Sequence, residues 1–381
     1  MKLKDVTLQE IKGIWGDELQ DGEKGTPVIK TNNMTYEGHV DLSHITFRNI
    51  PASKVTNCLL RYGDLLIEKS GGTKTHSVGY VNIFEDKNDE YVANNFIFVL
   101  RPNSQLIDSK YLFYQLKNRY ESGQIELLHN QTTGIQNLKV QSYLDQEIKY
   151  VSMQAQQKIS KKLDKIEKAI KLEKAVLNSL DALIKSRFNE LFGDIVENSK
   201  NFELVNFEHF VNDMHIGPFG SDLKNDAFCT KDKAYCMVYE QKHAIQKTMD
   251  VPTRYVDEAK FIKLKHFIVG PGDILVSCRG TLGECYLIPK NAPIGVIHPS
   301  LMLIKPKKET NAEFLLLLLE RMLSNQEGKG SGVKMAIRAS ELAKYKTINP
   351  SKPMIDRYMN FYHEVDKLKF SFLIPSKMVI V

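Results

Sequence analysis

The sequence lacks any long hydrophobic run. No stretch of about 18 apolar residues occurs along the chain, so a transmembrane helix is not among the expected elements. The opening residues MKLKDVTLQEIKG contain no apolar core of the kind that a secretory signal needs. The cysteines number five, an odd count without a secretory signal. We therefore expect reduced thiols and a cytoplasmic protein.

Metal-ligand patterns are also missing. Cys229 and Cys236, like Cys278 and Cys285, stand further apart than the roughly two to four residues typical of zinc pairs. The ten histidines are scattered singly, and no H-E-x-x-H occurs. We expect no metal site in this chain.

The glycine-rich segments do not match a nucleotide-binding motif. Residues 70–75 and 328–332 both fail the spacing of a phosphate-binding P-loop. No G-x-G-x-x-G follows an expected strand, and no G-x-S-x-G occurs. An NTPase, a dinucleotide-dependent enzyme and a serine hydrolase are therefore not indicated.

The residues that DNA-modifying enzymes need are incomplete. Adenine methyltransferases carry an Asn- or Asp-Pro-Pro-aromatic loop, and the sequence has no Pro-Pro pair. Nucleases of the PD-(D/E)xK type need an acidic pair and a lysine around a divalent ion. Asp64 with Glu68 and Lys69 has the wrong spacing, and Asp273 with Glu284 lacks the lysine. Both aspartates follow a glycine at the mouth of an expected strand, so we expect them to cap turns.

The sequence does contain an internal repeat, in which one pattern of residues occurs twice. Residues 62–83 and 271–289 each open with Gly-Asp, continue through an apolar triplet and reach a glycine-bearing turn. Downstream, VANNFIFVLRPNS corresponds to VIHPSLMLIKPKK, and expected helices follow at Tyr111–Tyr120 and Glu313–Ser324. The copies lie roughly 200 residues apart, far above the period of a solenoid. The sequence therefore predicts two similar mixed α/β domains.

A long helix is predicted between the two copies. No glycine or proline occurs from Gln154 to Phe192, and Gly193 is placed to end the helix. Apolar residues recur there by alternate steps of four and three, which is typical of a coiled-coil seam. Met354–Lys369 is the natural antiparallel partner, and Pro375 is expected to end that second helix. The predicted seam comprises Ile159, Leu163, Ile166, Ile170, Leu177, Leu180, Ile184 and Leu191 with Ile355, Met359, Tyr362 and Val365.

Two similar domains joined by rigid helices suit a ligand with two recognition points, such as duplex DNA. The formal net charge of +6 permits such a ligand without requiring it. Loops in both halves concentrate hydrogen-bond donors beside glycines, although ordinary surface turns have the same composition. The candidate DNA contacts are Lys69, Lys74, Thr75, His76, Asn130, Gln131, Thr132 and Gln136 in the first half, and His215, Ser221, Lys224, Arg279, Thr281, Lys329, Lys334 and Arg338 in the second.

These features together resemble the specificity subunit of Type I restriction-modification systems, over residues 10–369. The resemblance rests on GIWGDE, GDLLIEKSGGT, GPFGSDLK and GDILVSCRGTLG, taken in this order. Before the long helix, Gln156-Gln157-Lys158-Ile159 and Leu163-Asp164-Lys165-Ile166 also fit the family. VSMQA replaces the usual proline pair, and the second half keeps prolines but loses the glutamine.

The resemblance implies an α+β fold with two pseudo-symmetric target-recognition domains separated by long helices that form an antiparallel coiled coil. The expected divisions are 1–153, first recognition domain; 154–200, central helix; 201–353, second recognition domain; and 354–381, a short C-terminal helix with an atypical tail from Phe370. That short helix would weaken the spacer or the second docking site for a partner.

The resemblance also implies that this chain is not an enzyme. Each domain would read one half of a split DNA site. Two methyltransferase subunits would bring S-adenosylmethionine, and restriction subunits would bring ATP and Mg²⁺, with no cofactor held by this chain. The competing interpretations are a structural coiled-coil adaptor with two protein-binding domains, and a stand-alone nuclease or methyltransferase.

Overall fold

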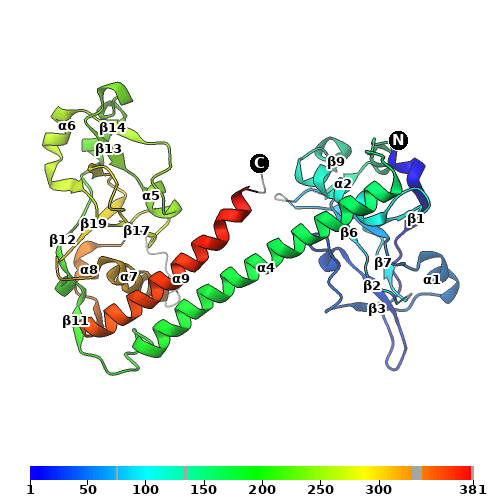
Figure 1. The fold of residues 1–381 in the computed structure, drawn as a ribbon, viewed down its shortest axis with the longest axis horizontal. Helices are drawn as coiled ribbons and strands as arrows, with labels where there is room; N and C mark the ends of the chain where they lie inside the picture. Colours follow the sequence, from blue (N-terminus) through cyan, green and yellow to red (C-terminus); the bar gives the residue numbers. More distant parts are fainter. Residues whose placement is uncertain (74–75, 89, 133–134, 328–336, 379–381) are drawn as a thin grey trace. The chain divides into compact units, whose positions relative to one another are not determined.

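The computed structural model describes residues 1–381 except 74–75, 89, 133–134, 328–336 and 379–381. It divides into two compact units, Met1–Leu172 and Glu173–Val381. Helix α4 (Met153–Phe192) continues without a break across this boundary (Figure 1). The sequence-derived domain bounds remain predictions, since the division between the units falls inside the helix.

The first unit is built on an antiparallel sheet. Its strands lie in the order β1 (Thr7–Lys12), β8 (Ile97–Pro102), β4 (Leu65–Glu68) and β6 (Val81–Ile83). Every residue of β4 and β8 is buried, because both faces of the sheet are covered. Leu65 packs on one face with helix α2 (Ser109–Glu121), and Leu66 packs in a separate cluster on the other.

Smaller elements complete the first unit. One sheet consists of β3 (Thr46–Arg48), β2 (Thr26–Ile29) and β7 (Val92–Ala93), with β2 antiparallel to β3 and parallel to β7. Another consists of β5 (Ser70–Gly71), β10 (Ile135–Leu138) and β9 (His129–Thr132). The short helices are η1 (Leu3–Val6), η2 (Thr31–Asn33), α1 (Ala52–Cys58), η3 (Glu126–Leu128) and α3 (Val140–Leu144).

The second unit repeats this plan. Its main sheet has the order β12 (Val211–Ile216), β19 (Leu301–Pro306), β16 (Ile274–Ser277) and β17 (Cys285–Leu287), which matches β1-β8-β4-β6 position by position. A second sheet has the order β14 (Arg254–Val256), β13 (Cys236–Tyr239), β18 (Gly295–Ile297) and β15 (Ile268–Val269). Its β13 is antiparallel to β14 and parallel to β18, as β2 is to β3 and β7. The predicted duplication is confirmed.

The remaining elements of the second unit are mostly short. Helix α7 (Ala312–Glu327) corresponds to α2, so both helices predicted from the repeat are confirmed. The others are β11 (Leu204–Asn206), β20 (Lys346–Ile348), η4 (Phe207–Phe210), η5 (Gly220–Leu223), η6 (Asn225–Ala227), η7 (Lys231–Lys233), α5 (Gln241–Gln246), α6 (Glu258–Lys263), η8 (Lys265–Phe267), α8 (Ala339–Ala343) and α9 (Lys352–Met378).

The Gly-Asp pairs occupy equivalent turns in the two units. Gly63 and Gly272 have φ angles of 90° and 86°, which a side chain would resist. The Asp64 carboxylate accepts a hydrogen bond from the Arg61 backbone N–H (2.8 Å). The Asp273 carboxylate accepts one from the Gly270 N–H (2.9 Å). The predicted turn-capping role of both aspartates is confirmed.

Helix α4 ends where the sequence predicted. Gly193 has a φ of 67°, and its N–H donates to the Asn189 carbonyl (2.8 Å). In the last turns, Phe188 and Phe192 enter the core of the second unit and contact the rings of Phe314 and Tyr358. The seam predicted from the sequence steps from Ile184 to Leu191 and includes neither phenylalanine.

Helix α9 lies antiparallel to the C-terminal part of α4 within the second unit. Phe188 contacts Tyr358, Arg187 lies 5.9 Å from the ring of Phe361, and Asp181 forms an ion pair with Lys369. These contacts run in opposite directions along the two helices, as Figure 1 also shows. The pairing agrees with the predicted partner for this part of α4.

The predicted end of α9 at Pro375 is wrong. The helix continues to Met378. A proline removes one helical hydrogen bond, here to the carbonyl of Ser371 four residues earlier. Ser371 is exposed, so water can bond to that carbonyl and the helix need not stop.

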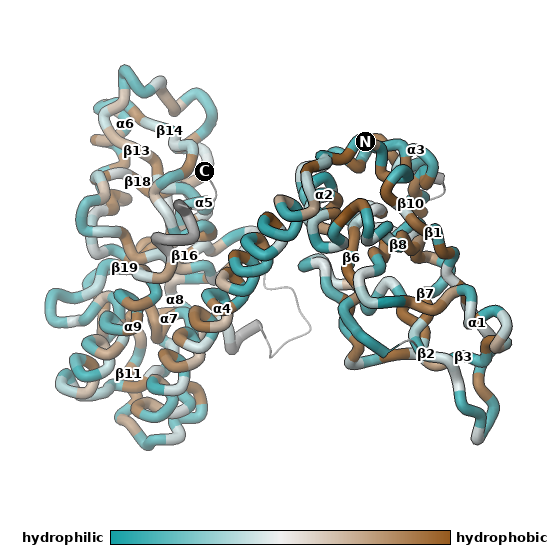
Figure 2. Tube along the Cα trace, turned by 45° about the vertical axis from the view of Figure 1, so that its right-hand side comes forward, coloured by the Kyte–Doolittle hydropathy of each residue, from teal (hydrophilic) through white to brown (hydrophobic). Residues whose placement is uncertain are grey.

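The predicted seam residues differ in burial along α4. Ile184 is buried and Leu191 packs on the second core, with Ile355, Met359, Tyr362 and Val365 packed or buried on α9. Leu163, Leu177 and Leu180 are half-buried. Ile159, Ile166 and Ile170 are exposed. Figure 2 shows hydrophobic and hydrophilic residues alternating along α4. A coiled coil over the first part of α4 stays a prediction.

Candidate nucleic-acid interface

In the first unit, two candidate loops meet in one small sheet. The loop after β4 forms β5, which pairs with β10 and through it with β9. Ser70 Oγ donates to Asn137 Oδ1 (2.7 Å), and the Val78 N–H donates to Gln136 Oε1 (3.1 Å). This pairing brings Lys69, His76, Asn130 and Gln136 into one region. Lys74 and Thr75 lie outside the described residues, as do the side chains of Gln131 and Thr132.

Two glycines are required at the base of this loop. Gly71 and Gly72 have φ angles of 130° and 68°. A Cβ on Gly72 would lie 2.7 Å from Gln136 Oε1, and one on Gly71 would lie 2.7 Å from Glu68 Oε1. The loop therefore closes directly over the side chains of Glu68 and Gln136, and larger residues would displace it.

Glu68 is a buried carboxyl group beneath the loop. It is 7% exposed, and Gly72 N–H lies 3.4 Å from its Oε1. Burial raises the pKa of Glu68 to about 7, with the Gly72 hydrogen bond acting in the opposite direction. Lys69 follows directly, and burial lowers its pKa, with Lys12 adding to the effect. The charge at the base of this loop is therefore sensitive to pH near neutrality.

An aromatic contact in the same region was missed by sequence reasoning. The rings of Tyr36 and His76 are stacked, with centroids 3.8 Å apart and planes 17° apart. Tyr36 is 50% exposed and also contacts Tyr80, which contacts Tyr120. Tyr36 stands in the turn after β2, far from His76 in sequence. No local spacing rule could have joined the two.

In the second unit, the equivalent loop joins β16 to β17. Arg279 and Thr281 are exposed at its tip, and Gly280 between them has a φ of 69°. The side-chain amide of Gln241 donates to the carbonyls of Arg279 (2.6 Å) and Thr281 (2.9 Å). The Ile337 N–H donates to the Cys278 carbonyl (3.3 Å), just as the Leu138 N–H donates to that of Lys69 (2.8 Å).

The hydrogen bond between Ile337 and Cys278 places Arg338, the next residue, beside the loop that carries Arg279. Arg338 is exposed and lies 3.7 Å from Glu341. Lys329 and Lys334 lie outside the described residues. Ser221 and Lys224 are exposed at η5, next to the exposed ring of Phe219.

His215 is not the loop residue that the sequence predicted. It lies within strand β12 and is mostly buried. Its ring stacks on that of His266, with centroids 4.6 Å apart, and its Nδ1 lies 3.1 Å from Asp213 Oδ2. Strand β12 extends to Ile216, one residue beyond His215, so the histidine faces neighbouring side chains instead of lying in the loop that follows.

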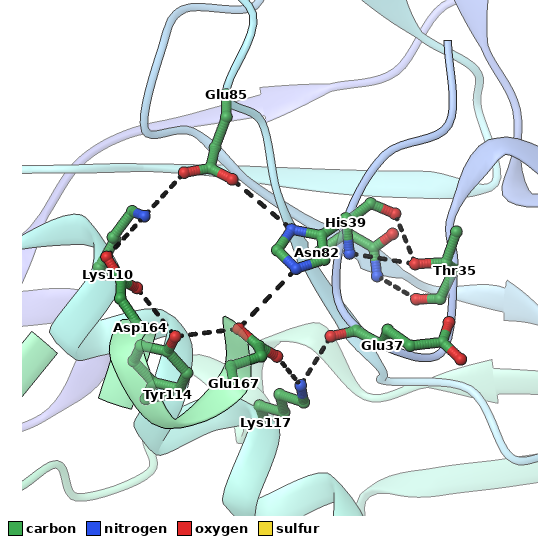
Figure 3. A network of polar contacts seen from close by, with 10 residues as sticks. All are labelled: Thr35, Glu37, His39, Asn82, Glu85, Lys110, Tyr114, Lys117, Asp164 and Glu167. Carbon is green, nitrogen blue, oxygen red and sulfur yellow. Dashed lines mark hydrogen bonds and ion pairs between the residues drawn. The ribbon is translucent and has the colours of Figure 1, made fainter. Parts of the chain in front are cut away.

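A polar network joins helix α4 to the first unit (Figure 3). Lys110 on α2 forms ion pairs with Glu85 and with Asp164 of α4, both at 2.9 Å. His39 lies 3.5 Å from the other oxygen of Glu85. The hydrogen bond from His39, together with Lys110, lowers the pKa of Glu85 to about 2 against the effect of burial.

The same network continues one turn along α4. The Tyr114 hydroxyl lies within hydrogen-bonding distance of Asp164 (2.9 Å) and Glu167 (3.0 Å), and Lys117 donates to Glu167 (2.7 Å). The buried Gln156 accepts from the Asp108 N–H (2.8 Å) and donates to the Val151 carbonyl (2.9 Å). Helix α4 is thus fixed to α2 by charged groups and by one buried amide.

The second unit uses an inverted arrangement at the equivalent junction. Asp108 and Asn311 accept corresponding hydrogen bonds at the starts of α2 and α7, which places Glu313 where the first unit has Lys110. Glu313 lies 2.9 Å from His363 of α9. In the second unit the acidic group is therefore on α7, whereas in the first unit it is on α4.

Comparison with known proteins identifies the family. The profile of the Type I restriction modification DNA specificity domain matches residues 1–182 and 227–357. The chain belongs to this family. Its role is therefore DNA recognition for a Type I restriction-modification system. No curated protein sequence matches the chain.

Two solved structures share the fold of this DNA-specificity protein. One is the Type-I restriction-modification system S subunit from M. genitalium, with 14% identity and a TM-score of 0.57. The other comes from work on complex assembly and conformational transition of the type I R-M system, with 13% identity and a TM-score of 0.57. Each alignment covers 99% of this chain and 93% of the other. The predicted fold class is confirmed.

Two features are absent from the described part of the chain. Among the residues that the structure describes, no three His, Cys, Asp or Glu side chains are placed to hold a metal ion. In the same part of the chain, no helix is long and apolar enough to cross a membrane.

Proposed function

We propose that this chain is the non-catalytic subunit that reads a bipartite DNA target, with one half-site for each unit. One observation carries the proposal. The two units repeat the same strand order, and each places a glycine-bearing loop after the third strand of its main sheet, β4 or β16, beside a second donor-bearing segment. Duplex DNA read at two points suits two such loops.

The donors in these loops fit base and phosphate recognition. Arg279 and Thr281 are exposed at one loop tip, and His76 and Asn130 are near the other. Arginine reads guanine through two hydrogen bonds, and asparagine reads adenine in the same way. Backbone N–H groups around the glycines would contact phosphates.

The partners and cofactors follow from this role. Two methyltransferase subunits would dock on α4, α9 and the recognition units and supply S-adenosylmethionine. Restriction subunits would join them and supply ATP-driven cleavage with Mg²⁺. The exposed side chains Ile159, Ile166 and Ile170 on α4 support such docking, because exposed apolar stripes on helices favour partner helices. The complex would act in the cytoplasm on cellular and incoming DNA.

Genome-wide mapping of methylated adenines tests the proposal. The chain is co-expressed with its cognate methyltransferase subunit, and methylated sites are sequenced. A bipartite motif is expected, and Arg279→Ala is expected to relax one half of it. A motif without two separated halves would contradict the assignment of one half-site to each unit. Methylation or cleavage by the purified chain alone would contradict the non-catalytic role.

A structural adaptor is the second candidate. Such a protein would give no methylated motif and no sequence preference in a gel shift with the methyltransferase complex. The match of the family profile to both units favours DNA specificity over this role.

A further inference from the structure

One side chain supports the tip of the second unit's reading loop, residues 278–283. The hairpin closes at Ser277, whose backbone N–H donates to the Glu284 carbonyl (2.8 Å) and whose carbonyl accepts from Gly283 (2.9 Å). Residues 278–282 form the tip beyond this closure. There the single amide nitrogen of Gln241 donates both of its hydrogens, one to Arg279 and one to Thr281.

Gln241 stands on a fixed base. It is the first residue of α5, directly after Tyr239 and Glu240. Tyr239 is fully buried, and its hydroxyl donates to the Pro293 carbonyl (2.6 Å). Glu240 forms ion pairs with Arg254 and with Lys242. The amide therefore reaches from a well-packed element to an exposed one.

The geometry of the tip depends on this amide. Gly280 lies between the two bonded carbonyls in a left-handed conformation, and a Cβ there would approach Gln241 Nε2 at 3.5 Å. Carbonyls pinned at both sides of this glycine fix the direction of the backbone at 279 and 281. Because a side chain leaves from its backbone, the same two bonds fix where Arg279 and Thr281 project.

The first unit has a corresponding contact made by different chemistry. Strands β2 and β13 are equivalent, and the segment after each reaches the loop after the third strand of the main sheet. In the first unit that segment supplies Tyr36, whose ring stacks on His76. In the second it supplies Gln241.

We propose that Gln241 and Tyr36 are positioning residues that set the base preference of their own half-sites by holding the reading loops. The inference rests on the proposed function, because it takes these loops as the DNA-reading elements. Specificity then depends both on the residues that contact DNA and on a separate segment of each unit that holds the reading loop.

The test uses the complete complex of this chain with its methyltransferase subunits. The DNA probe is a duplex library with randomised bases, read out by adenine methylation. Gln241→Met keeps the length of the side chain and removes both donors. Gln241→Asn keeps the amide but shortens its reach. Gln246→Met, at the exposed end of the same helix, is the matched control.

Both Gln241 variants are expected to reduce discrimination between bases at the second half-site by about tenfold, as two lost hydrogen bonds imply. Discrimination at the first half-site should stay unchanged. A loss of stability alone would lower methylation at every sequence equally and leave the preferences intact. An unchanged base profile at the second half-site in either folded variant overturns the role of Gln241.

Tyr36→Leu applies the same reasoning to the first half-site. Tyr62→Leu is its control, since Tyr62 is 54% exposed and Tyr36 is 50% exposed. Relaxed preference at the first half-site only is expected for Tyr36→Leu. An unchanged profile overturns the role of Tyr36.

Arg279→Ala separates this inference from the proposed function. If Arg279→Ala relaxes the second half-site and the Gln241 variants do not, only the positioning role fails. If Arg279→Ala has no effect on any half-site, the loop is not a reading element and the proposed interface fails with it.

Discussion

The guanidinium of Arg101 lies against the carboxylate of Asp64 in a buried two-point contact, Nε to Oδ1 at 2.9 Å and Nη2 to Oδ2 at 2.7 Å. The same guanidinium donates to the Leu59 carbonyl (2.8 Å). In the second unit, the equivalent Asp273 lies 3.8 Å from Lys305. The third strand of the main sheet thus follows an aspartate that the neighbouring strand holds by a bidentate pair in the first unit and by a single longer contact in the second.

Removing the first pair should therefore cost more than removing the second. Asp64→Ala leaves Arg101 charged and unpaired in a buried site, so we expect a loss of roughly 3–5 kcal/mol of unfolding free energy. Asp273→Ala should cost about 1 kcal/mol, because Lys305 can reach solvent. Urea unfolding of the two variants measures the difference, and equal losses would contradict it.

Glu68 should make the first unit less stable at alkaline pH. Its pKa is raised to about 7 by burial, above the ordinary value for glutamate. The stability linked to this shift is complete below about pH 4 and is lost as the pH rises through 7. Glu68→Gln should then be more stable than the parent chain at pH 8, by on the order of 3 kcal/mol. Thermal unfolding of the parent chain and of Glu68→Gln between about pH 4 and pH 8 measures this. The same dependence of stability on pH in both proteins would contradict the prediction.

Glu85 should make the first unit less stable at acid pH, the opposite of the effect of Glu68. The hydrogen bond from His39, with Lys110, lowers the pKa of Glu85 to about 2. Its contribution to stability is complete above the ordinary glutamate pKa and is lost as the pH falls from about 4.5 towards 2. Glu85→Gln should remove part of the acid sensitivity of the first unit. Unfolding curves at pH 3 and pH 6 test this, and an unchanged pH dependence would count against it.

The two parts of the α4 stripe should respond differently to truncation. Phe188 is 1% exposed in the second core, so Phe188→Ala should cost roughly 3–5 kcal/mol. Ile166 is 40% exposed, and Ile166→Ala should change the stability of the isolated chain by less than about 0.5 kcal/mol. If α4 docks the methyltransferase, Ile166→Ala should still weaken assembly, which analytical ultracentrifugation of the complex would detect.

The sequence predicted the repeated plan because its signals are local. Gly63-Asp64 and Gly272-Asp273 mark turns by their own chemistry, and the glycine-free run before Gly193 marks a helix and its end. The two similar mixed α/β domains and the long helix between them could therefore be predicted from the residues themselves.

The candidate site was only partly predictable, because its key contacts join distant segments. Gln241 meets Arg279, and Tyr36 meets His76, through loops whose shape no spacing rule determines. His215 was assigned to a loop because a strand end has no strong local signal. The path of the α4 stripe through Phe188 depends on the partner core and not on a fixed three-four step.

The inverted charges at the two helix junctions have a consequence for folding. A chain with two similar halves risks mispairing, in which a helix docks on the wrong copy within the molecule or on a neighbouring molecule. Asp164 of α4 meets Lys110, whereas the corresponding position on α7 is Glu313. A misplaced α4 would set carboxylate against carboxylate, and like charges at close range disfavour that pairing. The duplicated molecule thus carries an electrostatic means of telling its halves apart while it assembles.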